Sequence, residues 1–130
     1  MMILVIHPSP TVRYVLRSQI EREGHQVLCF GNPVVAWSAL FHTKMVPLPD
    51  ILFLTIASTS QVTEYALLRL FKAHGPQIPV VVMCPRDNAL LHLKAHLAGA
   101  TLFFLGEPML LQQVIALVRR IATRSDTSTI

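Results

Sequence analysis

The chain has 130 residues, of which 52% are hydrophobic and 14% charged, and it carries a formal net charge of +4. This length fits one domain with a single core. The apolar runs are too short to span a membrane, and the start MMILVI lacks the basic region and apolar length of a signal peptide, so we expect a cytoplasmic protein. The two cysteines, Cys29 and Cys84, lie in separate apolar segments without CxxC spacing, which indicates reduced core thiols.

Short apolar runs rich in β-formers alternate along the chain with segments of helical period. The predicted strands span residues 3–6, 26–30, 51–56, 80–83 and 102–105. The predicted helices span residues 10–23, 33–42, 62–72, 88–98 and 109–121. Continuous apolar strands are typical of a parallel sheet that is covered on both faces. The pattern predicts a doubly wound α/β domain over residues 1–122, followed by a polar tail or linker at 123–130.

Right-handed crossovers place all the strand-to-helix loops along the carboxyl edge of such a sheet, where sites in this architecture normally lie. The polar or reactive residues that follow the strands differ from loop to loop. In chain order they are His7, Pro8, Thr55, Ser58, Thr59, Ser60, Cys84 and Glu107. Each of these loops is therefore a candidate for binding or chemistry.

Four motifs in order along the chain resemble those of a response-regulator receiver domain. PDILFL (49–54) resembles the strand that leads to the receiver's phosphoacceptor, and HGPQIPVVVM (74–83) resembles the run into its fourth strand. AGA (98–100) has the receiver spacing from that strand, and Glu107-Pro108 resembles the terminal Lys-Pro. The resemblance covers nearly the whole chain. It implies a flavodoxin-like (βα)5 three-layer sandwich with parallel strand order 2-1-3-4-5.

The same resemblance implies that the receiver's chemical residues have been replaced. Thr55 stands at the phosphoacceptor position, and His7 and Pro8 stand where an acidic pair would bind magnesium. The degenerate pocket then consists of His7, Pro8, Ala57, Cys84, Phe103 and Glu107. Magnesium prefers hard oxygen ligands, and phosphoryl transfer needs cations that neutralise developing charge. The resemblance therefore implies a pseudo-receiver that is not an enzyme, needs no cofactor and acts in bacterial signalling or regulation.

Other uses of this edge stay open as alternatives. His7, Cys84 and Glu107 are ligand types that a borderline metal such as zinc accepts, although ordinary packed side chains are the favoured interpretation. Cys84 and His7 could form a nucleophile pair, but their strands are not adjacent in the expected order. Thr55 and the hydroxyls at 58–60 could be modified by a kinase. No glycine-rich phosphate cradle follows the first or third strand, which speaks against a nucleotide or flavin site.

The predicted helix at 88–98 carries two apolar stripes. By the resemblance to receivers, the sheet-facing stripe consists of Leu91, Ala95 and Ala98. The second stripe consists of Leu90, Leu93 and Leu97, at positions i, i+3 and i+7 on a different face of the helix. In receivers this second face belongs to the surface of the fourth helix, fifth strand and fifth helix, which serves output and dimerisation. The predicted interaction surface therefore comprises Leu90, Leu93, Leu97, Phe104 and Arg119, with a protein partner or a second copy of the chain as its occupant.

The cationic residues Arg119, Arg120 and Arg124 are the densest part of the positive charge. Cations at a helix end complement the helix dipole, which is the favoured interpretation. We do not expect nucleic-acid binding, because no aromatic residue or recognised motif accompanies them. A regulatory module of a DNA-binding protein, and a repurposed pocket that binds a small ligand or metal, remain the alternative functions.

Overall fold

Five parallel strands form one sheet in the order β2-β1-β3-β4-β5. The computed structural model describes residues 1–43, 47–56, 61–84, 89–100, 102–105 and 111–128, with the backbone alone described at 102–105 and 124–128. The strands are β1 Met2–Ile6, β2 Gln26–Phe30, β3 Ile51–Thr55, β4 Val80–Cys84 and β5 Leu102–Leu105. The predicted fold class and strand order are confirmed.

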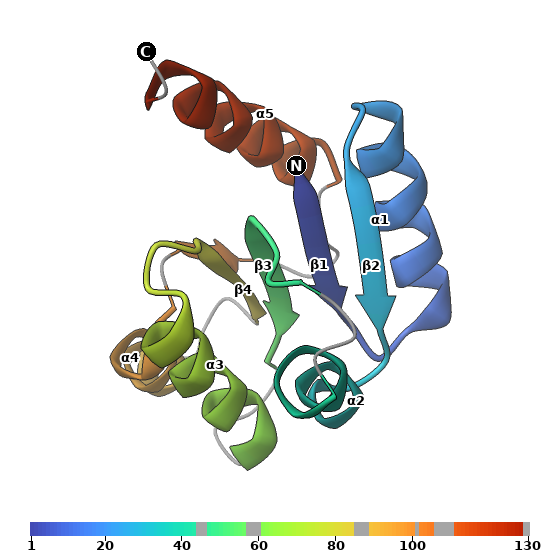
Figure 1. Cartoon of the computed structure of the whole chain (residues 1–130). Helices are drawn as coiled ribbons and strands as arrows, with labels where there is room; N and C mark the ends of the chain where they lie inside the picture. The colour runs from blue at the N-terminus through green and yellow to red at the C-terminus, as the bar shows by residue number, and fades with distance from the viewer. Residues whose placement is uncertain (44–46, 57–60, 85–88, 101, 106–110, 129–130) are drawn as a thin grey trace.

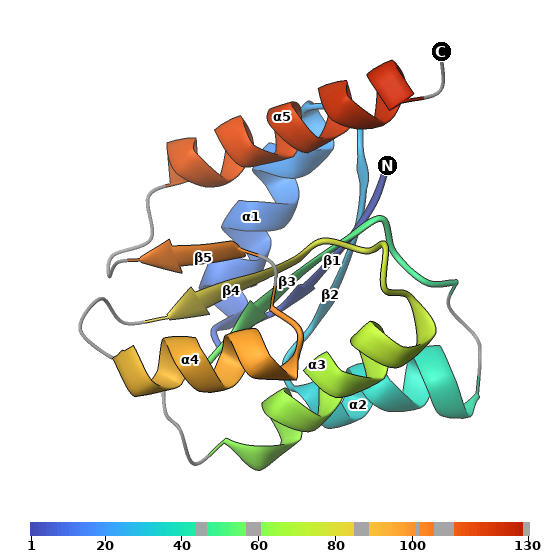
Figure 2. The same cartoon turned by 90° about the vertical axis from the view of Figure 1, so that its left-hand side faces the viewer.

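The helices cover both faces of the sheet and give three layers (Figures 1 and 2). One face carries α1 and α5, and the other carries α2, the π-helix η1, α3 and α4. The helices are α1 Pro10–Arg22, α2 Pro33–Trp37, η1 Ser38–His42, α3 Val62–His74, α4 Ala89–Ala98 and α5 Leu111–Ser128. Within the described ranges, no helix combines the length and the apolar character needed to cross a membrane.

Two apolar clusters fill the space between the sheet and its two helical layers. Alternate residues of each strand point to opposite faces, so Leu4 and Leu52 join the cluster under α3 and α4, while Ile3 and Phe53 join the cluster under α1 and α5. All four side chains are buried. This double burial explains why the strands read as continuous apolar runs rather than alternating ones.

Side-chain caps fix where the first two helices begin. The Ser9 hydroxyl accepts a hydrogen bond from the Val12 N–H at 3.3 Å, and the Asn32 side chain accepts one from the Val35 N–H at 2.9 Å. In both cases a proline occupies the first helical position, where its missing N–H costs nothing. The caps therefore follow directly from Ser-Pro and Asn-Pro in the sequence.

The predicted single helix at 33–42 divides in the structure into α2 and the π-helix η1. The Thr43 N–H donates to the Ser38 carbonyl at 2.8 Å, which is a bond of π-helical spacing. The wider turn stacks the Trp37 and His42 rings, which are five residues apart, with centroids at 5.6 Å. A pattern of helical period does not distinguish an α-helix from this wider form.

The last helix continues well beyond its predicted end at residue 121. α5 runs to Ser128, so the backbone at 123–128 is helical. No glycine or proline interrupts residues 111–128, and the Thr123 hydroxyl donates to the Arg119 carbonyl at 2.8 Å. The helix therefore ends later than predicted, at Ser128 instead of residue 121, while the role of residues 123–130 as a polar tail or linker stays a prediction.

Gly99 lets α3 and α4 approach each other closely. Its φ of +127° lies in the region that side chains other than glycine rarely adopt. A Cβ atom at this position would lie 3.1 Å from the Lys72 Cβ and 3.2 Å from the Leu68 carbonyl oxygen. The glycine of the AGA motif therefore serves helix packing at the end of α4.

Candidate functional site

Three of the residues predicted to share the carboxyl edge of the sheet, His7, Thr55 and Cys84, lie at the ends of neighbouring strands. β1 pairs with β3 with Ile6 opposite Leu54, and β3 pairs with β4 with Thr55 opposite Met83. His7 therefore follows directly beside the end of β3, and Cys84 ends the next strand. The topology brings three of the predicted pocket positions to one edge.

The loop after β1 is held by its own side chains. The His7 Nδ1 accepts a hydrogen bond from the Ser9 N–H at 3.0 Å. The Arg13 Nη1 donates to the His7 carbonyl at 2.7 Å and to the Pro8 carbonyl at 3.1 Å. The guanidinium of α1 therefore brings a fixed positive charge to the loop where a receiver would hold its metal ion. Sequence reasoning missed this role of Arg13, because its spacing from the loop is not a known motif.

Thr55 ends β3 with a buried hydroxyl that makes no hydrogen bond within the described structure. A buried polar atom without a partner carries most of its desolvation penalty, so such atoms are rare in folded proteins. The hydroxyl is uncharged, and no base in the described part of the chain is hydrogen-bonded to it. As it stands, Thr55 is neither an anionic acceptor for a phosphoryl group nor a metal ligand of the carboxylate type.

Cys84 has a different partner from the one considered in the sequence. Its Sγ lies 3.2 Å from the Nε2 of His92, on α4, eight residues further along the chain. Burial raises the pKa of the Cys84 thiol, so the thiol form prevails at neutral pH. A protonated, buried sulfur is a poor nucleophile. The pair therefore ties α4 to the end of β4 rather than forming an activated Cys–His site.

Polar contacts at the start of α3, and one contact between α3 and α4, lie near this edge. Glu64 is buried, and its carboxylate accepts hydrogen bonds from the side chains of Gln61 and Thr63. The Lys94 Nζ lies 4.6 Å from the centroid of the buried Tyr65 ring, a cation–π contact. Burial, with the nearby Cys84 and Glu64, raises the pKa of Tyr65. The Lys94–Tyr65 contact therefore links α4 to α3, and the apolar periodicity of the chain carries no signal for any of these contacts.

Three predicted pocket residues and one residue of the predicted interaction surface, Phe104, lie outside what the structure describes in full. Ala57 and Glu107 are not among the described residues, and Phe103 and Phe104 lie in β5, where the backbone alone is described. The metal set that includes Glu107 is therefore untested. Among the side chains that are described, no group of three His, Cys, Asp or Glu residues could hold a metal ion.

The two stripes of α4 differ sharply in exposure. Leu91, Ala95 and Ala98 are buried against the sheet, as the resemblance to receivers implied. Leu90, Leu93 and Leu97 are 65%, 55% and 68% exposed. The leucines at i, i+3 and i+7 therefore form an apolar ridge on the protein surface, called the leucine ridge below.

The predicted surface residue Arg119 is exposed on α5 and forms an ion pair with Glu23, the residue that follows α1. Exposed ion pairs contribute little to stability, so this contact does not fix the helix strongly. Arg120 is also exposed, and the side chain of Arg124 is outside the described set.

This arrangement of sheet, helices and carboxyl edge is the receiver fold of the flavodoxin-like class. No protein-family profile matches the chain, and no curated protein matches it either. Several solved structures, in contrast, are similar to the chain in fold. The receiver domain of NtrX from Brucella abortus is 25% identical, with a TM-score of 0.72 over 92% of this chain and 96% of that one. The Francisella response regulator 1452 receiver domain is 13% identical, with a TM-score of 0.76 over 95% of this chain and 98% of that one.

A longer solved structure matches the chain over only part of its own length. A crystal structure of NtrX from Brucella abortus in complex with ADP is 23% identical to the chain, with a TM-score of 0.75. The match covers 98% of this chain and 27% of that one. The chain therefore spans about a quarter of that protein and corresponds in fold to a receiver domain.

Proposed function

We propose that this chain is a pseudo-receiver of bacterial two-component signalling, a receiver-fold module that acts by protein–protein contact without being phosphorylated. The observation that carries the proposal is the residue at the end of β3. Thr55 stands there, with a buried hydroxyl, where a receiver presents an aspartate. A threonine cannot form the acyl phosphate on which receiver signalling depends.

The rest of the carboxyl edge supports the same conclusion. Pro8 offers no side-chain ligand, and the Nδ1 of His7 is engaged by a backbone N–H. The Arg13 guanidinium already lies on the loop carbonyls, where it would repel a divalent cation. Magnesium requires several hard oxygen ligands in a regular geometry. The described residues offer no such set, so phosphoryl transfer at this edge lacks its usual metal.

The leucine ridge supports the interaction part of the proposal. Three leucines on one helix, each more than half exposed, form a continuous apolar patch. Isolated surface leucines are common, but contiguous apolar patches usually mark interaction sites. Cys84 and Lys94 tie α4 to the end of β4 and to α3, so the ridge is presented on a positioned helix.

Phosphorylation can be tested directly. The protein is incubated with acetyl phosphate and Mg²⁺, and its intact mass is measured beside an active receiver domain treated in the same way. We expect the active receiver to gain one phosphoryl group and this protein to gain none. A phosphorylated parent protein would contradict the proposal.

The interaction surface needs a separate test. Light scattering gives the mass of the parent and of Leu93→Glu, with Tyr14→Glu as a control, because Tyr14 is also a large exposed side chain and belongs to α1 on the opposite helical layer. We expect Leu93→Glu to lose an association that Tyr14→Glu retains. Unchanged mass and unchanged partner binding in Leu93→Glu would contradict a role for the ridge.

One observation favours a second candidate function, a pocket repurposed for a small ligand. The buried Thr55 hydroxyl has no hydrogen-bond partner among the described residues, and a bound group could supply one. Thermal denaturation in the presence of Mg²⁺ or Zn²⁺ tests the metal version of this candidate. A rise in melting temperature that Thr55→Val abolishes would support it.

A further inference from the structure

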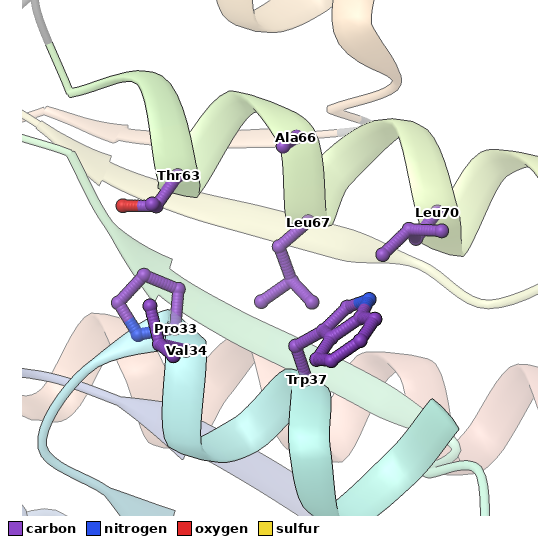
Figure 3. Close-up of a pocket in the computed structure, with 7 residues that line it drawn as sticks. All are labelled: Pro33, Val34, Trp37, Thr63, Ala66, Leu67 and Leu70. Carbon is purple, nitrogen blue, oxygen red and sulfur yellow. The ribbon is translucent and has the colours of Figure 1, made fainter. Parts of the chain in front are cut away.

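An apolar groove lies between α2 and α3 on the same helical layer as the leucine ridge. Figure 3 shows Val34 and Trp37 of α2 facing Leu67 and Leu70 of α3, with Thr63 at one end. The cavity has a volume of about 230 Å³. Pockets for small molecules are usually larger, at roughly 300–1,000 Å³, and contain a few convergent polar groups. The size and the apolar lining therefore suit protein side chains better than a metabolite.

The leucine ridge has the form that such a groove accepts. Amphipathic helices enter apolar grooves through anchors at i, i+3, i+4 or i+7, and the ridge supplies i, i+3 and i+7. Leu90 and Leu97 are seven residues apart, as are Thr63 and Leu70 along the groove, and each pair spans about 10 Å at 1.5 Å per residue. Of the described helices, α4 alone exposes three large apolar side chains at this spacing.

The buried area decides between a single and a reciprocal contact. The ridge presents on the order of 300 Å² of apolar surface, similar to the largest patch on a typical monomer. With the groove and its rim, one contact would bury roughly 600–800 Å², which is below the roughly 1,200–2,000 Å² of stable complexes. Two such contacts in one assembly reach that range.

The position of α3 allows both contacts to form together. α3 packs against α2 on one side and α4 on the other, so groove and ridge lie on either side of the same helix (Figure 1). Two copies that face each other through this layer can each place α4 over the partner's α2–α3 groove. Such an arrangement is a closed two-fold dimer in which the same surface is used twice.

We infer that the occupant of the groove is a second copy of this chain, and that two copies form a reciprocal dimer in which each leucine ridge lies in the other's α2–α3 groove. The inference rests on the proposed function, because it names the partner of the ridge. It adds a second surface, the groove, which that function does not require. Val34, Trp37 and Leu70 are the groove residues that would contact the partner's leucines.

Matched variants separate the groove from the ridge. Val34→Glu places a charge in the groove, and Val35→Glu places one on the same helix outside it, at residues that are 57% and 50% exposed. Leu93→Glu disrupts the ridge, and Tyr14→Glu is its control on the opposite layer. All four positions are exposed, so circular dichroism should show folded proteins.

Sedimentation velocity over a range of concentrations measures the dimer. We expect the parent to approach twice 14.5 kDa at high concentration. Val34→Glu and Leu93→Glu should each raise the dissociation constant roughly tenfold or more, while the two controls stay near the parent value. An equimolar mixture of Val34→Glu and Leu93→Glu should associate more strongly than either variant alone, because the mixed dimer regains one intact ridge-in-groove contact.

Three other sedimentation results would contradict the reciprocal dimer. If Leu93→Glu is monomeric but Val34→Glu dimerises like the parent, the inference is wrong and the proposed role of the ridge stands. If the parent is monomeric at every concentration, the groove and ridge do not bind a second copy, and a helix of another protein becomes their occupant. If the mixture of variants associates no more strongly than either variant alone while each variant is folded, the reciprocal arrangement is refuted.

Discussion

The neighbouring residues Leu90 and Leu91 provide the sharpest test of how α4 is seated. Leu91 is fully buried in the cluster between the sheet, α3 and α4, whereas Leu90 is largely exposed. Replacing each in turn by alanine removes the same atoms from adjacent positions of one helix. Alanine has the highest helix propensity, so neither substitution weakens the helix itself. The difference in stability between the two variants therefore reports burial.

The expected magnitudes follow from the two environments. Truncating a fully buried leucine costs about 2–5 kcal/mol, from the lost transfer free energy and the cavity left behind. Truncating an exposed leucine changes the free energy of unfolding by about 0.5 kcal/mol or less. For a chain of this size, a loss of about 3 kcal/mol lowers the melting temperature by roughly 10 °C.

Urea denaturation followed by circular dichroism gives both free energies of unfolding. The measurement belongs at low protein concentration, because self-association would add stability that depends on concentration. We expect Leu91→Ala to unfold at a clearly lower urea concentration than the parent and Leu90→Ala to match it. Equal losses in the two variants would mean that the leucine ridge is packed inside the fold, and the interaction surface would have to be abandoned.

Three further predictions concern the loops and helix ends. Gly99→Ala should lower the free energy of unfolding by about 2–3 kcal/mol, because backbone strain at φ +127° adds to the close contact with α3. Gly24→Ala should lower it by only about 1 kcal/mol, because Gly24 has φ +89° but open space around it. Arg13→Met should cost about 1 kcal/mol in urea denaturation, because the loop carbonyls of β1 lose their donor. Burial raises the pKa of Cys84, so above the pKa of an ordinary thiol the unfolded chain loses the Cys84 proton while the folded chain keeps it. The free energy of unfolding should therefore fall as the pH rises above that value. Cys84→Ala should make this fall with pH less steep.

Each of these predictions has a clear contrary result. Equal losses in the two glycine variants would contradict the close approach of α3 and α4. An unchanged urea midpoint in Arg13→Met would show that the guanidinium contacts add nothing to the loop. Alkylation of Cys84 in the folded protein as fast as in urea would contradict its burial, and the pH dependence would then need another source.

The sequence predicted the sheet and its edge well, because both depend on local and periodic features. Continuous apolar strands, Ser-Pro and Asn-Pro caps and helical spacing are properties of short segments. Together they determined five βα units and placed His7, Thr55 and Cys84 at strand ends. The replaced positions could likewise be named from spacing along the chain.

The hydrogen-bond partners at that edge could not be predicted in the same way. Arg13 reaches back to the His7 and Pro8 carbonyls, and His92 rather than His7 lies against Cys84. These contacts depend on side-chain directions and on how α4 crosses the end of β4, and no periodic pattern encodes them. The same holds for the extension of α5 to Ser128, where weak helix formers remain helical.

The leucines of α4 show most clearly what each level determines. The sequence alone established that the helix has two apolar stripes, because residue spacing fixes which side chains share a face. The resemblance to receivers implied that Leu91, Ala95 and Ala98 face the sheet, but residue spacing could not establish whether the second stripe is buried as well, since both stripes are apolar. The tertiary structure decided this: Leu91, Ala95 and Ala98 are buried, and the small alanines let the helix lie close to the sheet. The bulkier Leu90, Leu93 and Leu97 were left at the surface, beside a groove of matching length.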